Sequence, residues 1–229
     1  MAHPVEVDHF NAFRDRLKNQ YPKAQQIRYF ASHLQFEADA PLKNDVSHSI
    51  VGVRLDDAAG KWVVQGKSDG LAVSRLAPYE SWEQLVATVR ELWPVYVEIF
   101  QPEAVLRLGV RYINMVPLPD QRLHDLDAIL TVGPKIPEGL PQEFSEFMTR
   151  LVVPMAHNGI VLTIVQATGA ATSGVDVGKA CIVLDIDASC EQSFGPDWSD
   201  MWKKLDSLRD AKNMAFFNSL TKPAWEQFL

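Results

Sequence analysis

The sequence is poor in cysteine, in long apolar runs and in positive charge, and each shortage excludes a class of protein. Its two cysteines, Cys181 and Cys190, form no disulfide framework and lack the spacing of a metal-binding pair. We therefore expect a reducing, cytoplasmic setting. No apolar run approaches the roughly 18 residues of a membrane-spanning helix, and the amino-terminal MAHPVEVDHF has no apolar signal core. We expect neither secretion nor membrane insertion.

Negative charge exceeds positive charge, with 29 acidic against 22 basic residues and a net charge of −7. Nucleic-acid binders usually present a basic face, so nucleic acid is an unlikely partner on composition alone. The 229 residues are 47% hydrophobic, which is enough to bury a sizeable core without disulfides or metals.

The common catalytic motifs are also missing. The chain contains no G-x-S-x-G, H-E-x-x-H or C-x-x-C. The segment 174–180, GVDVGKA, resembles a phosphate-binding loop, but its glycines are one residue too close and Ala180 replaces the hydroxyl residue that holds magnesium. We predict no cofactor and favour a protein that is not an enzyme.

Hydrophobic periodicity predicts an α+β fold. The first half reads as a helix, four strands and a helix, over residues 7–21, 27–38, 49–55, 61–67, 71–76 and 81–100. The second half reads as a central strand, a short helix, three strands and a helix, over residues 104–116, 123–130, 144–155, 160–167, 179–187 and 197–220. We expect antiparallel sheets with covering helices, arranged as two structurally similar halves, 5–103 and 104–229, in a single compact domain, 1–229.

Local signals fix several ends of these elements. Ser81 and Gln84 have the spacing of a capping box, which predicts that the hydroxyl of Ser81 caps the helix that follows. Asp197 is the expected cap of the last helix. Residues 68–70 form a short turn in which Gly70, with Asp69 as a second candidate, can adopt a positive φ. The sequence HNG at 157–159 predicts a hairpin.

Asp185 and Asp187 lie at alternate positions of a predicted strand and therefore share one face. Two carboxylates at a strand end can hold Mg²⁺ when a third ligand and water complete the site. The alternative is an ordinary solvated face, and it is the one that we favour.

Three residues of the central strand, AVLRLGVRYINMV at 104–116, are candidates for binding a ligand or an anion. Arg107 and Arg111 point to one side of the strand, and the guanidinium group is suited to bind a carboxylate or phosphate with two parallel hydrogen bonds. Asn114 points to the opposite, apolar side, where its amide needs partners. The structural alternative gives the arginines ion pairs across the sheet, with Asp185 and Asp187 as candidate partners, and gives Asn114 a structural hydrogen bond.

The chain resembles a sporadically distributed family of uncharacterised bacterial proteins, which share a mid-chain motif of the form R-x-G-x-R-Y-I-N. The motif is filled here by residues 107–114, RLGVRYIN, and weaker matches extend over nearly the whole chain. The start of the chain departs from the family, whose members usually open with an apolar strand. The resemblance implies an accessory role, such as genome defence or one half of a toxin and antitoxin pair, and no established reaction.

Two functions follow as expectations. The first is a protein-binding or self-associating module, because the chain lacks a catalytic motif and holds six tryptophans and eleven phenylalanines, some of which would lie at an interface. The alternative is a metal-dependent hydrolase or nuclease, in which Asp185 and Asp187 hold the metal and Arg107 or Arg111 holds a phosphate.

Overall fold

The computed structural model describes residues 7–35, 43–118, 126–143, 145–170 and 178–228. It confirms the predicted α+β class, with two antiparallel four-stranded sheets and their helices. The chain divides into two compact units, Met1–Pro102 and Glu103–Leu229. This boundary lies one residue from the predicted division between the two halves. The expectation that both halves form one domain stays a prediction.

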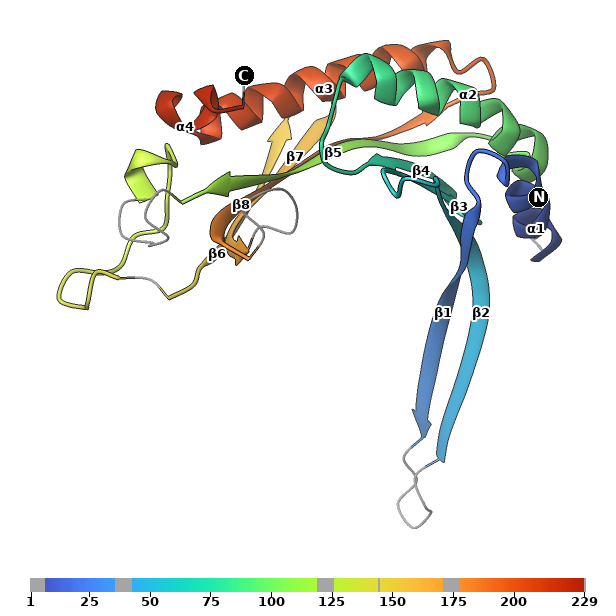
Figure 1. The fold of residues 1–229 in the computed structure, drawn as a ribbon, viewed down its shortest axis with the longest axis horizontal. Coiled ribbons are helices and arrows are strands. Elements are labelled where there is room, and N and C mark those ends of the chain that lie inside the picture. The colour runs from blue at the N-terminus through green and yellow to red at the C-terminus, as the bar shows by residue number, and fades with distance from the viewer. Residues whose placement is uncertain (1–6, 36–42, 119–125, 144, 171–177, 229) are drawn as a thin grey trace. The chain divides into compact units, whose positions relative to one another are not determined.

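The first unit is a four-stranded meander with two helices (Figure 1). Its elements are α1 (Val7–Leu17), β1 (Lys23–Gln35), β2 (Lys43–Asp56), β3 (Trp62–Lys67), β4 (Gly70–Arg75) and α2 (Trp82–Phe100). β3 pairs with β2 only between Gly52 and Asp56, so the remainder of β1 and β2 continues as a two-stranded ribbon. We call this ribbon, residues 28–35 and 43–50, the β-arm.

Aromatic side chains from α1 and α2 form the core of the first unit. Phe13 is completely buried, and its ring lies directly against Gly66 of β3, where a Cβ atom would come within 2.7 Å of the ring. The hydroxyl of Tyr96 donates a 3.0 Å hydrogen bond to the carbonyl of Lys67, which joins α2 to the end of β3. The glycine is therefore required for the close approach of α1 to the sheet.

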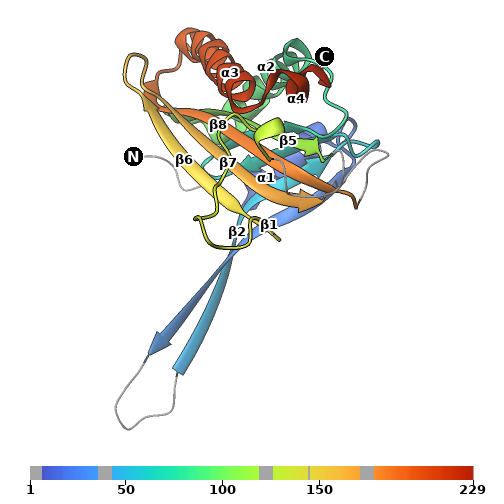
Figure 2. The same ribbon diagram turned by 90° about the vertical axis from the view of Figure 1, so that its left-hand side faces the viewer.

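The second unit contains a four-stranded sheet in the order β5-β8-β7-β6. Its elements are β5 (Val105–Pro117), a 3₁₀ turn η1 (Leu126–Ala128), β6 (Met148–Met155), β7 (Ile160–Ala170), β8 (Ala180–Phe194), α3 (Ser199–Ser219) and α4 (Lys222–Glu226). α3 lies over one face of this sheet and contacts β5, β8 and β7 (Figure 2). β5 and β6 form the two edges of the sheet.

Alternation of side chains along β8 explains why this sheet has one covered and one open face. Ile182, Leu184 and Ile186 are completely buried on the side that faces α3, whereas Asp185 and Asp187 are half-buried on the opposite side. The burial follows the two-residue period of a strand that is covered on one face.

Three local predictions are corrected by the structure. α3 begins after Trp198, which adopts a left-handed conformation with φ 55°, so Asp197 is not its N-cap. Gly70 does not have a positive φ; the positive φ in this part of the sheet belongs to Gly60, in the turn that precedes β3. α3 ends at Ser219, and a separate helix, α4, begins at Lys222.

Several element bounds also differ from the predictions. β8 continues to Phe194, seven residues beyond its predicted end, because its second half still pairs with β5 and β7. β6 begins at Met148 and not at residue 144, which lies outside the described residues. The predicted loop at 168–178 starts later, since β7 runs to Ala170; residues 171–177 lie outside the described part of the chain.

Candidate functional site

The four charged candidates from the sequence meet on the open face of the second sheet. β5 and β8 are antiparallel neighbours in a register that places Arg111 opposite Asp187. Arg111 donates two hydrogen bonds to Asp185, from Nε at 2.8 Å and from Nη2 at 2.5 Å. Arg107 donates one to Asp187, from Nη2 at 3.0 Å. We call these two ion pairs the Arg–Asp ladder.

The ladder is accessible to water. The side chains of Arg107 and Arg111 are 57% and 59% exposed, and those of Asp187 and Asp185 are 27% and 15% exposed. The hydrogen bonds that Arg111 donates to Asp185 raise the pKa of Arg111 and so keep the guanidinium charged. Gly109 leaves space for the pair of Arg107 and Asp187, since a Cβ atom at position 109 would lie 3.3 Å from Nη1 of Arg107. Exposed pairs of this kind each contribute about 0 to 1 kcal/mol to stability.

This geometry is what the structural alternative predicts for the arginines. Each guanidinium that could bind an anion already donates to a carboxylate, and each carboxylate that could bind a metal already accepts from an arginine. Among the described residues, no group of three histidine, cysteine or acidic side chains is placed to hold a metal ion. Metal binding by Asp185 and Asp187 stays a prediction without a third ligand.

Asn114 points to the opposite face, toward α3. Its Nδ2 donates a 3.0 Å hydrogen bond to the carbonyl of Leu184, the residue directly across from it on β8. The amide therefore makes a structural hydrogen bond, as the structural alternative predicts, and its backbone partner lies on the neighbouring strand. The side chain is half-buried and not fully buried.

Lys212 is a buried charge that the sequence analysis missed. It lies on α3 with 8% of its surface exposed, and its Nζ is 3.6 Å from the centre of the Tyr112 ring on β5. Burial lowers the pKa of this lysine to about 8, with a smaller contribution from the charge of Arg209. The signal was in the sequence, because Lys212 follows Leu205 and Leu208 at helical spacing and therefore falls on the buried stripe.

β6 presents an open edge with apolar side chains. The carbonyl of Phe147 accepts a hydrogen bond from the backbone N of Thr168, and the N–H of Phe147 donates to the hydroxyl of Thr168. Odd-numbered residues of β6 therefore direct their backbone groups to β7 and even-numbered residues direct theirs outward. Met148, Leu151, Val152 and Val153 are 76%, 48%, 49% and 43% exposed. We call residues 146–154, with their outward backbone groups, the β6 edge.

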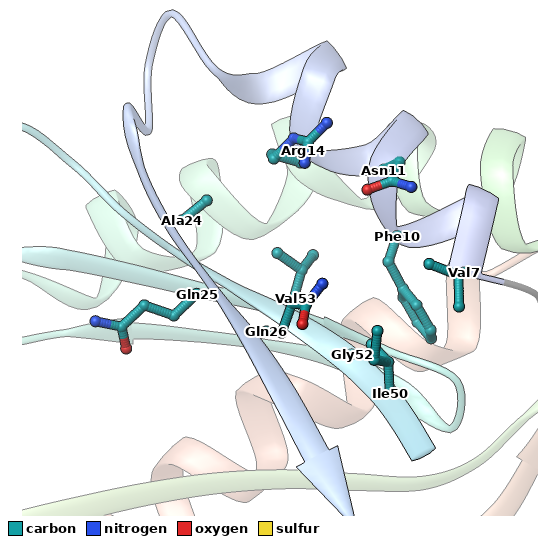
Figure 3. Close-up of a pocket in the computed structure, with 10 residues that line it drawn as sticks. All are labelled: Val7, Phe10, Asn11, Arg14, Ala24, Gln25, Gln26, Ile50, Gly52 and Val53. Carbon is teal, nitrogen blue, oxygen red and sulfur yellow. The ribbon is translucent and has the colours of Figure 1, made fainter. Parts of the chain in front are cut away.

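Two surface hollows among the described residues are smaller than most ligand pockets. One, of about 80 Å³, lies between α1, the start of β1 and the second half of β2, where Phe10, Arg14 and Val53 form part of its wall (Figure 3). Another, of about 240 Å³, is formed by residues 192–201 at the start of α3. Ligand pockets usually measure roughly 300 to 1,000 Å³.

Comparison with known proteins identifies no relative, since the chain matches no family model, no curated protein and no solved structure. The resemblance carried by residues 107–114 therefore stays a prediction. No helix in the described part of the chain is long and apolar enough to cross a membrane.

Proposed function

We propose that the protein is a protein-binding module that acts by strand addition at the β6 edge. The observation that carries this proposal is found on one strand: its outward backbone groups pair with no other strand among the described residues, and four of its apolar side chains are exposed. Strand addition uses both features, because main-chain hydrogen bonds supply affinity and alternate side chains supply specificity.

The composition of β6 supports this function. Proteins usually protect sheet edges with charged residues, bulges, proline or a covering segment. β6, with the sequence MTRLVVPM, holds one charged residue, Arg150, and one proline, Pro154, near its end. Pro154 directs its nitrogen outward, where it blocks pairing only at that end of the strand. Most of the edge is therefore available to a partner strand.

The β-arm offers a second exposed surface of the same character. Tyr29 and Phe30 are 62% and 64% exposed, and Val46 is 59% exposed. The ring centres of Phe30 and His48 lie 5.9 Å apart across the ribbon. An isolated two-stranded ribbon is only marginally stable in water, and exposed aromatic side chains are enriched at protein interfaces. The arm would gain stability from a protein partner.

The proposal is tested by a substitution that places a positive charge on the β6 edge. Val152→Lys places an amine on an exposed position of β6, and Ile113→Lys is the matched control on the open face of the same sheet, where Ile113 is 57% exposed. We expect the parent and the control to assemble, or to retain a protein partner on an affinity column, and Val152→Lys to do neither. A parent that is monomeric at every concentration, and that retains the same proteins as Val152→Lys, would contradict the proposal.

A further inference from the structure

Three residues on the outer side of the β6 edge form a charge pattern that is complementary to itself. Met148 and Arg150 lie on one face of β6, and Glu146 stands two residues before Met148. Phe147, between them, still bonds to the backbone of β7, so the spacing places Glu146 on the same face. All three are exposed. Among the described residues, neither Glu146 nor Arg150 has an ion-pair partner. When two copies of this segment run antiparallel, the arginine of one copy can therefore lie across from the glutamate of the other.

We propose that the partner at the β6 edge is a second copy of this chain, paired antiparallel with Met148 opposite Met148 of the second copy. This inference rests on the proposed function, strand addition at β6. In this register Glu146 lies opposite Arg150 of the second copy, and Arg150 lies opposite its Glu146. Opposite charges directly across an antiparallel pair stabilise it, and the two-fold symmetry forms the pair twice.

The other registers are less favourable. Outward groups belong to even-numbered residues, so hydrogen-bonded partners change in steps of two along one strand. The next register places Glu146 opposite Val152, and the one after it places Arg150 opposite Arg150, where like charges repel. A further step places Met148 opposite Pro154, which has no N–H to donate.

The pairing joins two four-stranded sheets into one continuous sheet across the dimer. The paired segment is short, and stable interfaces bury about 1,200 to 2,000 Å² in total. The dimer therefore forms and dissociates with concentration, and its two ion pairs, at the surface, make it weaker at high salt.

Charge exchange gives a sharp test by sedimentation equilibrium. Glu146→Arg alone and Arg150→Glu alone place like charges opposite each other, and each should raise the dimer dissociation constant by roughly tenfold or more. The double variant Glu146→Arg/Arg150→Glu restores opposite charges and should dimerise like the parent. A mixture of the two single variants should form a heterodimer, because every cross pair is then complementary.

A disulfide trap tests the register itself. Met148→Cys places two thiols on the symmetry axis, where hydrogen-bonded partners have Cα atoms about 5.5 Å apart, within disulfide range. Val152→Cys is the matched control on the same face, and its copy would lie on the order of 27 Å away. The two natural cysteines are buried and leave the introduced thiol as the reporter.

We expect rapid oxidation of Met148→Cys to a covalent dimer and none for Val152→Cys. Equal oxidation of both variants, or a double charge variant that fails to recover dimerisation, would overturn this register. A parent that stays monomeric while β6 captures another protein, sensitive to Val152→Lys, overturns self-pairing and leaves the proposed function standing. A monomeric parent without such capture overturns both.

Discussion

Asn114 joins β5 to β8 through one side-chain hydrogen bond. Asn114→Leu removes this bond, and we expect the free energy of unfolding to fall by about 1 kcal/mol, since the side chain is half-buried. Asn114→Asp should cost more at neutral pH, because a carboxylate would face the carbonyl oxygen of Leu184. Chemical unfolding of both variants at pH 7 is the measurement. If both match the parent, Asn114 makes no structural contribution, and a ligand contact becomes the better explanation.

Lys212 makes stability depend on pH in an unusual direction. Its pKa is about 8 when folded and near 10.5 when unfolded, so between these values the unfolded chain binds more protons. Stability from this group therefore rises as pH increases from 8 to 10, by roughly 1 to 2 kcal/mol. Urea unfolding across this range should show the rise in the parent and its absence in Lys212→Met. The same slope in both proteins would show that Lys212 titrates normally.

The two residues show what a sequence reveals about single side chains. The faces of β5 were predictable from alternation alone, and with them the separation of Arg107 and Arg111 from Asn114. Asp185 and Asp187 were expected as partners of the arginines, but which arginine bonds to which aspartate was not predictable. Leu184 was not predictable as the acceptor of Asn114, because these residues are 70 or more positions apart in the chain. The burial of Lys212 was not predicted because its charge suggested a solvated position, although its spacing along the helix indicated a buried one.

α2 begins with the cap that its sequence predicts. The hydroxyl of Ser81 accepts a 3.2 Å hydrogen bond from the backbone N of Gln84. Ser81→Ala should lower the free energy of unfolding by about 0.5 to 2 kcal/mol, and Ser81→Asp should retain most of it because aspartate also caps. Thermal melts of the two variants test this. Equal loss in both would indicate that Ser81 contributes by something other than capping.

Elements with strong periodicity were predicted more accurately than their ends. The long apolar stripe of α2 and the alternation of β8 gave the correct element type. The start of α3 was missed because a left-handed tryptophan, Trp198, precedes the helix, which local propensity does not favour. The β-arm was not predicted. It exists because β3 pairs with only the last residues of β2, and the residue pattern within one strand does not show how far a neighbouring strand pairs with it.

At the scale of the whole molecule, exposed strand surfaces are the strongest candidates for a binding site. The Arg–Asp ladder satisfies its own charges, and the described hollows are small, whereas the β6 edge leaves backbone groups and apolar side chains exposed. Which strands form the edges of a sheet is a property of topology, so the sequence did not indicate β6 as an edge strand.

Amide hydrogen exchange at single-residue resolution tests this account most directly. In dilute protein, the N–H groups of Thr149, Leu151 and Val153 face β7 and should exchange slowly, whereas those of Met148 and Arg150 face outward and should exchange rapidly. Raising the protein concentration should slow Met148 and Arg150 without changing the other three. Rapid exchange of Met148 and Arg150 at every concentration, and in the presence of any retained partner, would contradict strand addition at β6.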